Sequence, residues 1–360
     1  MTGRQHPISV LVVEGSSDVR ASLVHLLNSD PCFTVVGAYA ATAAAIDHVL
    51  RCRPDVVLMD IRPPGMDGVE ATRRIMETRP VPIVVCGAAV RSQDAATMFD
   101  SFAAGAVACV TTPPDREHPS FTEVSRHLLQ TLKLMSEVKV IRRWAHLRNP
   151  STRPLVPPKI APSRKVKIVG IGASTGGPPV LQTILSAMPL DFPAPILIVQ
   201  HIVRDFISNL ADWLSQTTGA RVHVAEQGID PLPGHVYLAP DDHHMEIDSH
   251  GRISLNAAEP DNGLRPSVNH LFSSLADHCG PNAVGVLLTG MGRDGAEQLK
   301  RMKQRGAVTL AQDRSTSVVH GMAGEAISIG AVDWVLPPDQ IAPALVAIAA
   351  QQPLAEGAVP

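Results

Sequence analysis

The sequence predicts an α/β protein made of two doubly wound parallel-sheet domains, joined by a helix and a proline-rich linker. Short, unbroken apolar runs alternate with helix-like patterns in both halves of the chain. Such runs are typical of strands that are buried on both faces of a parallel sheet. Five prolines cluster between the two halves, and 360 residues are enough for about two domains.

Nine apolar runs are expected to form the two sheets. The first sheet is predicted from residues 8–13, 34–36, 56–59, 83–85 and 106–110, and the second from residues 166–171, 196–199, 284–289 and 308–311. Three short apolar segments within residues 234–255 predict a hairpin-like insertion in the second domain. Helical patterns between the runs complete the α/β alternation.

The segment between the sheets has its own composition. Residues 126–167 contain 11 Lys or Arg and one acidic residue, whereas the chain on either side is net acidic. Ser120 and Glu123 have the spacing of a capping box, and apolar residues recur at near-helical intervals after them, which predicts a helix running toward Trp144. The prolines that follow predict a semi-rigid linker.

These patterns predict two domains, at residues 7–125 and 165–350, with residues 126–164 as a linker helix and proline-rich segment. The positively charged linker is expected to be either a solvated spacer or a docking surface for an acidic partner. The two domains are acidic and the net charge is −3, so no nucleic-acid partner is expected.

Cysteine usage and hydropathy exclude other classes of protein. The five cysteines form no C-x-x-C pair and are odd in number, which disfavours a disulfide scaffold or a zinc ribbon and favours a reducing compartment, the cytoplasm. Glu14 interrupts the first apolar run, so no signal peptide is predicted. Pro31 to Ile46 falls short of the roughly 18 apolar residues that a membrane span needs, so no membrane insertion is expected.

Three polar side chains follow three strands of the predicted second sheet. Ser174 lies in a G-x-S-x-G turn, His201 comes directly after its strand, and Asp294 lies in the glycine-rich turn after the third. Because the carboxyl ends of parallel strands share one edge, we expect these side chains to converge. An imidazole that takes the serine proton, held by a carboxylate, is what acyl transfer requires. The chain order Ser, His, Asp disfavours an ordinary lipase-type hydrolase, in which Asp precedes His.

Each of these residues also has a simpler explanation. The glycines before and after Ser174 could bind a phosphate, but their spacing misses G-x-G-x-x-G by one position and no P-loop lysine follows. His201 is one of 15 histidines, and Asp294 could cap a helix that begins near Gly295. Residues 241–246 contain two Asp, two His and one Glu, but they are expected in the turn of the insertion, where they would splay, so no metal site is predicted.

Five motifs of the second domain are recognisable together. They are G-I-G-A-S-T-G-G at residues 170–177, Q-H at 200–201, L-P-G-H-V-Y-L-A-P at 232–240, R-P-S-V at 265–268 and L-T-G-M-G-R-D-G at 288–295. Together they resemble the catalytic domain of the chemotaxis protein-glutamate methylesterases, the CheB family, from about residue 165 to about residue 349. The resemblance implies Ser174 as nucleophile, His201 as general base and acid, and Asp294 as the residue that orients the imidazole. It also implies oxyanion donors in the turns that carry Thr175 and Met291.

The resemblance further implies a substrate and partners. The substrate would be the glutamate methyl ester on the cytoplasmic domains of methyl-accepting chemoreceptors, with deamidation of specific glutamines as a second activity and no cofactor for catalysis. Leu264 replaces a polar residue usual in the family, and Asn269 stands where Asp is common. These departures are expected to affect substrate contacts and to leave the triad intact.

Residues 7–125 resemble the receiver domain of response regulators, which implies a sensor histidine kinase as partner. Asp60 matches the phosphoacceptor at the end of the third strand. The resemblance also requires an acidic pair for Mg²⁺, a hydroxyl and a lysine, which here align with Glu14-Gly15, Gly87 and Thr112. We therefore expect a degenerate receiver in which Mg²⁺ binding is doubtful and Asp60 is phosphorylated weakly or not at all.

Two other functions stay open at this point. The protein could be a signalling scaffold with an idle esterase fold, which the eroded receiver favours and the intact triad disfavours. It could also be an esterase for a small molecule, a possibility that activity on small esters without activity on receptors would support.

Overall fold

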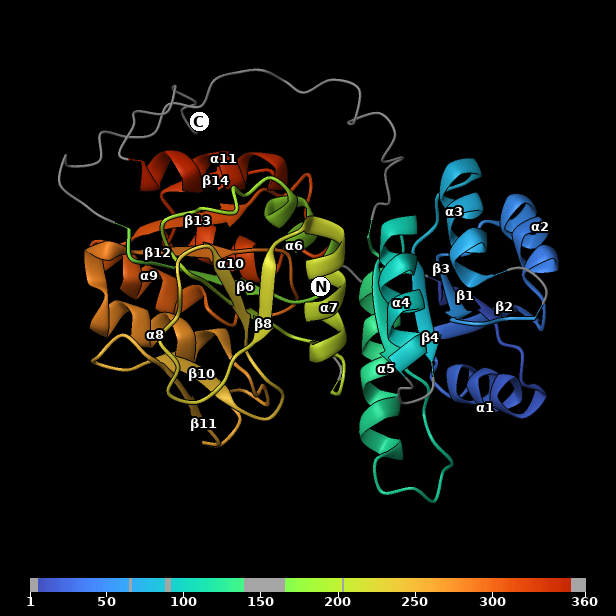
Figure 1. The fold of residues 1–360 in the computed structure, drawn as a ribbon. Coiled ribbons are helices and arrows are strands. Elements are labelled where there is room, and N and C mark those ends of the chain that lie inside the picture. Colours follow the sequence, from blue (N-terminus) through green and yellow to red (C-terminus); the bar gives the residue numbers. More distant parts are fainter. Residues whose placement is uncertain (1–5, 65–66, 88–91, 139–165, 203, 351–360) are drawn as a thin grey trace. The chain divides into compact units, whose positions relative to one another are not determined.

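The computed structural model describes residues 6–64, 67–87, 92–138, 166–202 and 204–350. The chain divides into two compact units, residues 1–150 and 151–360 (Figure 1). Each unit is built on a parallel β-sheet covered by helices, which confirms the predicted fold class.

The first unit contains a five-stranded parallel sheet in the order β2-β1-β3-β4-β5. Its elements are β1 (Ile8–Val13), α1 (Ser17–Asn28), β2 (Phe33–Tyr39), α2 (Thr42–Cys52), β3 (Val56–Asp60), α3 (Gly68–Thr78), β4 (Ile83–Gly87), α4 (Ser92–Ala104), β5 (Ala108–Thr111) and α5 (Phe121–Met135). All five predicted strands are present. The strands β1, β3 and β4 are buried almost throughout, as expected for strands covered on both faces.

The helix expected in the linker belongs instead to the first unit. It spans Phe121–Met135 as α5, and its side chains Leu128, Leu132 and Met135 are buried against strands β3, β4 and β5. A domain boundary at residue 125 is therefore wrong, because it cuts through a helix that closes the first sheet. The expected continuation of this helix toward Trp144 and the proline-rich segment, residues 139–165, lie outside the described residues.

The second unit has a seven-stranded parallel sheet in the order β14-β13-β12-β6-β7-β9-β8 and a separate two-stranded hairpin, β10-β11. Its elements are β6 (Ile168–Ala173), α6 (Gly177–Ser186), β7 (Ile196–Gln200), α7 (Ile207–Thr218), β8 (Arg221–Val224), β9 (His235–Leu238), β10 (His244–Ile247), β11 (Ile253–Asn256), α8 (Val268–His278), η2 (Gly280–Asn282), β12 (Ala283–Leu287), α9 (Ala296–Gln304), β13 (Val308–Gln312), α10 (Met322–Ser328), β14 (Trp334–Leu336) and α11 (Pro338–Ala349). The chain runs outward from β6 in both directions, so the strand order reverses between β6 and β12. Such a switch point opens a crevice at the carboxyl edge of the sheet.

The predicted hairpin-like insertion is only partly correct. Strand β9 pairs in parallel with β7 and β8 inside the main sheet, and only β10 and β11 form an antiparallel hairpin. The edge strands β8 and β14 were not predicted at all. A run of three or four residues carries too little periodicity to show which partner it will pair with, and the rest of the fold decides.

Two glycines of β6 allow helix α8 to lie directly on the strand. A Cβ at Gly170 would lie 2.4 Å from Cδ1 of Leu275, and one at Gly172 would lie 2.5 Å from Cγ1 of Val268. Both distances are too short for any side chain, so the backbone of β6 itself forms the floor under α8. This close packing brings the N-terminus of α8 to the carboxyl edge of the sheet.

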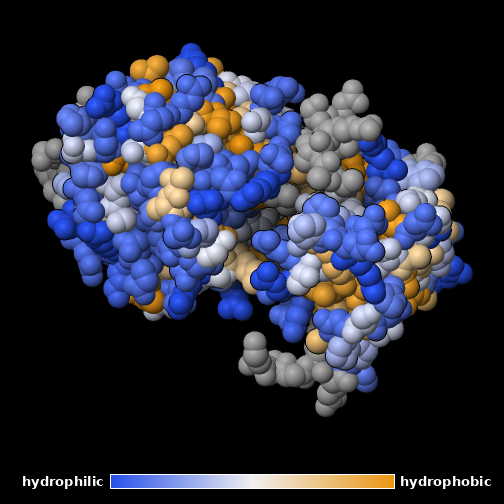
Figure 2. All heavy atoms as spheres, turned by 90° about the horizontal axis from the view of Figure 1, so that it is seen from below, coloured by the Kyte–Doolittle hydropathy of each residue, from blue (hydrophilic) through white to orange (hydrophobic). Residues whose placement is uncertain are grey.

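Hydrophilic residues cover most of the face shown in Figure 2, and hydrophobic residues appear there in smaller groups. Large hydrophobic side chains that are exposed include Leu190, Leu232 and Met291. None of the described helices is both long and apolar enough to cross a membrane.

Candidate active site

Strand register places Ser174 beside His201. Ala173 of β6 pairs with Gln200 of β7, and each of the two residues follows its paired neighbour directly. The backbone N–H of His201 donates to the carbonyl of Ala173 over 2.9 Å, which extends the pairing past the strands. The Ser174 hydroxyl makes no hydrogen bond to another described residue. Nucleophile–base bonds are often long before substrate binds, so this arrangement suits an enzyme at rest.

His201 and Asp294 are in direct contact, as the sequence predicts. Nε2 of His201 lies 2.9 Å from Oδ2 of Asp294, and only 12% and 5% of the two side chains are exposed. The contact is close enough for an ion pair, but Nε2 makes no hydrogen bond of good geometry to a described residue. Because Nε2 faces the carboxylate, Nδ1 is the ring nitrogen that remains for the serine.

The N-terminus of α8 holds the carboxylate of Asp294. The Ser267 hydroxyl donates to Oδ1 over 2.8 Å, the Val268 N–H to Oδ2 over 2.7 Å and the Asn269 N–H to Oδ1 over 3.1 Å. Burial alone raises the pKa of Asp294, but His201 and these donors outweigh it and hold the pKa below its ordinary value. The side chain is therefore a fixed anion.

Asp294 is indeed a helix cap, but not of the helix that the sequence suggested. The cap position of α9 is Gly295, in a left-handed conformation and without a side-chain hydrogen bond to the helix. Asp294 instead accepts from the first N–H groups of α8, which begins 26 residues earlier in the chain at Val268 and whose N-cap residue is Ser267. The capping and triad roles are compatible, because one carboxylate accepts from α8 and faces His201 at once.

Gln200 is a site residue that sequence reasoning treated only as part of a motif. Its side chain is buried, and its amide group donates to the carbonyls of Ser174 and His201, both over 2.8 Å. It thereby ties the nucleophile turn to the base. A polar residue at the end of an otherwise apolar strand was the available signal.

Replacing Gln200 by methionine should separate the two segments with little change in volume. The two carbonyls lose a buried donor, so we expect a loss of about 1–3 kcal/mol in unfolding free energy and about a tenfold drop in kcat. Urea unfolding and ester hydrolysis measure the two effects. Gln216→Met, on the exposed side of α7, is the matched control. Full activity of the Gln200 variant would show that the clamp is dispensable.

The two turns expected to supply oxyanion donors lie next to the nucleophile. The Ser174 N–H donates to the Thr289 carbonyl over 3.0 Å, and the Thr289 hydroxyl lies 3.0 Å from the carbonyl of Thr175. A Cβ at Gly290 would lie 2.7 Å from Cβ of Ser174, so the turn before Met291 touches the serine side chain. The backbone N–H groups of Thr175 and Met291 donate to no described residue.

The acidic and histidine-rich cluster of residues 241–246 is split by the fold. Asp242 pairs with Arg204 and Arg265 in the loop before β10, whereas His244 and Glu246 lie in β10 itself, which corrects the prediction that the whole cluster lies in a turn. Within the described residues, no three His, Cys, Asp or Glu side chains are grouped as metal ligands.

Asn269, one of the departures from the family pattern, contacts the triad segment. Its side-chain carbonyl accepts from the N–H of Gly295 over 3.0 Å, and its amide donates to Asp261 over 2.8 Å. An aspartate at position 269 would lie next to the carboxylate of Asp261, and the two negative charges would repel each other. The amide of Asn269 avoids this repulsion and donates a hydrogen bond to Asp261 instead.

The candidate phosphoacceptor lies at the carboxyl edge of the first sheet. Asp60 ends β3, and its Oδ2 accepts from the N–H of Gly15 over 3.4 Å. A Cβ at Gly15 would lie 2.7 Å from Cδ of Pro64, and one at Gly87 would lie 2.3 Å from Cδ1 of Ile61. A side chain at position 15 or 87 would therefore require Pro64 or the end of the Ile61 side chain to move.

The donor set at this edge does not fit Mg²⁺. Glu14 and Asp60 are its carboxylates, and Oε1 of Glu14 already accepts from the N–H of Ser16 over 2.8 Å. The ion needs about six oxygen ligands in near-octahedral geometry, and a second carboxylate at position 15 is missing. Thr112, at the lysine position, lies with its hydroxyl 3.2 Å from the Cys86 thiol and carries no charge.

The second unit brings a hydroxyl, an imidazole and a held carboxylate to one edge of an α/β sheet, and these are the groups that serine hydrolases use. Comparison with known sequences agrees with this class. The family described as CheB methylesterase matches residues 169–345, and the response regulator receiver domain matches residues 10–118.

Curated relatives match almost the whole chain. A protein-glutamate methylesterase/protein-glutamine glutaminase of Nitrosospira multiformis is 48% identical over 350 residues, 96% of this chain and 98% of that protein. A relative of the same name from Geobacter metallireducens is 47% identical and covers 96% of this chain and all of that protein. The CheB methylesterase catalytic domain of Thermotoga maritima, a crystal structure, covers 51% of this chain at 38% identity and a TM-score of 0.49. The chain belongs to the CheB family of protein-glutamate methylesterases and protein-glutamine glutaminases.

Proposed function

We propose that this protein hydrolyses the methyl esters of glutamate side chains on chemoreceptors and deamidates glutamine side chains, with Ser174 as its nucleophile. The observation that carries this proposal is the contact between His201 and Asp294 at the sheet edge where register places Ser174. The activities are those in the names of relatives that match this chain end to end.

Acylation would begin with the Ser174 hydroxyl and the ester carbonyl. As Oγ attacks the carbonyl carbon, Nδ1 of His201 takes the hydroxyl proton, and the anionic Asp294 stabilises the imidazolium that forms. The N–H groups of Thr175 and Met291 would stabilise the negative oxygen of the tetrahedral intermediate. The imidazolium then gives its proton to the departing methoxide, so methanol leaves and a glutamyl ester of Ser174 remains.

Hydrolysis of the acyl-enzyme would reverse these roles. His201 takes a proton from water as the oxygen attacks the same carbonyl carbon, and it returns this proton to Oγ of Ser174 as the acyl bond breaks. The glutamic acid that is released then loses its own proton to solvent. A glutamine substrate would follow the same path with ammonia as leaving group. Every step uses groups of this chain and water, so no cofactor is proposed.

The partners follow from this substrate class. We place the protein in the cytoplasm, with the cytoplasmic domains of methyl-accepting chemoreceptors as its macromolecular substrate. Free cysteines suit that reducing compartment, and five are present, at Cys32, Cys52, Cys86, Cys109 and Cys279.

Methanol release from receptor fragments that carry glutamate methyl esters tests the proposal. We expect release by the whole chain at a rate far above the rate without enzyme, together with new carboxylates at the methylated positions. Untouched receptor fragments combined with rapid turnover of small esters would favour a small-molecule esterase, and no turnover of either would favour the scaffold.

We propose further that Asp60 is phosphorylated weakly or not at all and that the esterase activity does not depend on a phosphoryl switch in the receiver. A phosphoryl group there would lack a cation to neutralise it and a hydroxyl to bind it, because Gly15 and Gly87 stand at those positions and their surroundings are filled by Pro64 and Ile61. A sensor histidine kinase is then not required for the basal activity.

Incubation with acetyl phosphate and Mg²⁺ tests this directly. We expect the intact mass to stay unchanged and the esterase rate to be the same with and without the phosphodonor, while a phosphorylatable receiver in the same tube gains a phosphoryl group. Asp60→Asn provides the site control. A stoichiometric mass gain that this variant abolishes would contradict the proposal, and a small gain would indicate slow phosphorylation.

A further inference from the structure

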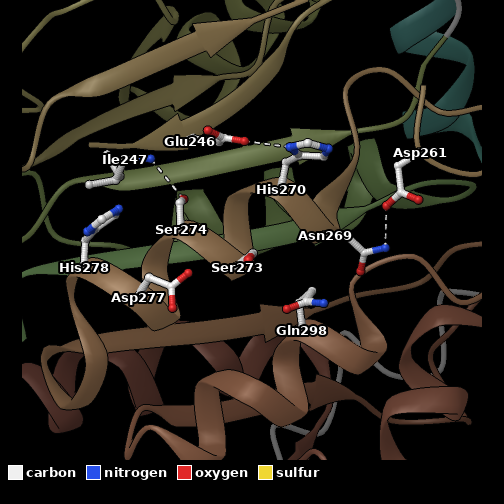
Figure 3. A pocket seen from close by; sticks show the side chains of 10 residues that line it. All are labelled: Glu246, Ile247, Asp261, Asn269, His270, Ser273, Ser274, Asp277, His278 and Gln298. Atoms are coloured by element: carbon white, nitrogen blue, oxygen red, sulfur yellow. Dashed lines mark hydrogen bonds and ion pairs between the residues drawn. The ribbon is translucent and has the colours of Figure 1, made fainter. Parts of the chain in front are cut away.

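A polar cavity lies along helix α8, and several of its lining residues belong to that helix. It has a volume of about 440 Å³, and Glu246, His270, Asn269 and Asp261 are among its lining residues (Figure 3). Nδ1 of His270 lies 2.6 Å from Oε1 of Glu246, and Asn269 donates to Asp261. The ring of His270 also stacks on that of His244, with the ring centroids 3.7 Å apart.

His244 is a fully buried histidine with both ring nitrogens engaged. Its Nδ1 accepts from the backbone N–H of Ser267 over 3.2 Å, and its Nε2 lies 3.2 Å from the carbonyl of Glu259, to which it must donate. Because one nitrogen accepts and the other donates, the ring is neutral and its tautomer is fixed. The residue that it holds, Ser267, is also completely buried.

Ser267 connects His244 to the triad. Its backbone N–H is bound by His244, and its hydroxyl donates to Oδ1 of Asp294 over 2.8 Å. The same hydroxyl lies 3.2 Å from a competing carboxylate oxygen of Asp261. The backbone anchor from His244 therefore helps to keep the hydroxyl directed at Asp294.

We infer that Ser267 and His244 are positioning residues for the esterase reaction: His244 fixes Ser267, and Ser267 orients the carboxylate of Asp294 toward His201. This inference rests on the proposed function. Neither residue is proposed to touch the reacting atoms. His244 contacts Ser267, and Ser267 in turn contacts Asp294.

The surroundings of His244 keep it in the required neutral form. Burial lowers its pKa, and the nearby His270 and Arg265 act in the same direction, whereas the carbonyl of Glu259 and the charge of Glu246 oppose them. A proton on Nδ1 would remove the acceptor for the Ser267 N–H. The ring stack and the Glu246–His270 pair fix the plane in which His244 presents that acceptor.

Losing the Ser267 hydroxyl should have a signature that simple destabilisation lacks. A carboxylate with one hydrogen bond fewer carries a less dispersed charge and holds the proton on its imidazole partner more tightly. In Ser267→Ala, kcat should fall about tenfold, the equivalent of one charge-assisted hydrogen bond, with little change in KM. The acid limb of the pH–rate profile should also move to higher pH.

Two substitutions of His244 separate its packing from its hydrogen bond. His244→Phe keeps a ring on His270 but has no acceptor, so it should shift kcat and the acid limb in the same direction as Ser267→Ala. His244→Asn places an amide oxygen near the position of Nδ1 and should recover at least half of the loss. The kcat of the double variant Ser267→Ala/His244→Phe should be lower than that of Ser267→Ala by no more than about twofold, because both substitutions act through the carboxylate of Asp294.

The experiment measures methanol release and, in parallel, the rate at which a serine-directed phosphonate labels Ser174, each against pH. His223→Phe, on the edge strand β8, is the control. Folded Ser267→Ala protein with wild-type kcat and an unmoved acid limb would overturn the inference, as would a drop in kcat without the shift. If His244→Phe does not fold, Ser267→Ala and His244→Asn decide. Phosphonate rates that shift as expected without methanol release would refute the substrate and support the positioning role.

Discussion

Replacing Ser174 by alanine is expected to lower kcat for methanol release on the order of 10⁴-fold or more, to within the residual catalysis that binding and oxyanion donors supply. The expectation follows from the mechanism, because without Oγ no acyl-enzyme can form. KM should change little, since the removed hydroxyl is not a substrate anchor. Methanol assays on methylated receptor fragments at saturating substrate measure this loss.

The Ser174 variant should remain folded. The serine side chain makes no hydrogen bond to another described residue, so its loss leaves no buried partner unsatisfied. Ser186→Ala, at the exposed end of α6, is the matched control and should keep full activity. Full activity of Ser174→Ala on both receptor fragments and small esters would show that Ser174 is not the nucleophile. The scaffold and the small-molecule esterase would then have to be considered again.

Asp294→Asn is the second change with a large expected effect. An amide cannot stabilise the imidazolium and favours the wrong tautomer of His201, so kcat should fall about 10⁴-fold. The same change removes a negative charge at the N-terminus of α8, which stabilises such a helix by about 0.3–1 kcal/mol or more when buried. Activity and unfolding free energy should therefore fall together, unlike in Ser174→Ala.

The stability difference should also depend on pH. The pKa of Asp294 is lowered in the folded protein, so the unfolded chain takes up the proton first as the pH falls. The stabilisation by this carboxylate is present above its unfolded value, about 3.9, and is lost as the pH falls through the lower folded value. The difference in unfolding free energy between wild type and Asp294→Asn should be constant near neutrality and shrink below about pH 4.

Urea unfolding at several pH values measures this difference. Asp212→Asn, on the exposed side of α7, is the control and should show no comparable change. A difference that grows as the pH falls would contradict the sign of the argument, because it would mean that the folded state prefers the protonated carboxyl.

The sequence predicted the central strands of both sheets, and the contact between His201 and Asp294, for a physical reason. Strands buried on both faces must be apolar throughout, and parallel strands must end at a common edge, so runs such as residues 196–199 showed both the strand and the position of His201. The G-x-S-x-G turn and the glycine-rich turn before Asp294 located the other two members. All three residues lie just after strands of the second sheet.

What the sequence did not show depends on contacts between distant segments. Capping of α8 by Asp294 joins residues 26 apart, and no local pattern near Gly295 indicates it. The role of His244 requires Ser267, which lies 23 residues later. The helix at Phe121–Met135 was assigned to the linker because its apolar stripe shows that one face is buried and not which sheet covers it.

In the receiver, the residues at two functional positions and the packing around them can be compared. The resemblance to receivers predicts that functional groups are missing at Gly15 and Gly87, and in the structure Pro64 and Ile61 lie next to these positions. Restoring a hydroxyl at Gly87 or a carboxylate at Gly15 would therefore require further changes around Asp60.

Stoichiometric labelling by a serine-directed phosphonate shows whether Ser174 is the nucleophile for methyl-ester hydrolysis. Samples of the whole chain labelled to different extents are assayed for methanol release from methylated receptor fragments, and the labelled residue is identified by peptide mapping. We expect activity to fall in direct proportion to the fraction of Ser174 that is labelled and to reach the background rate at one label per chain. Activity that survives complete labelling of Ser174, or that disappears while Ser174 stays unlabelled, would contradict it.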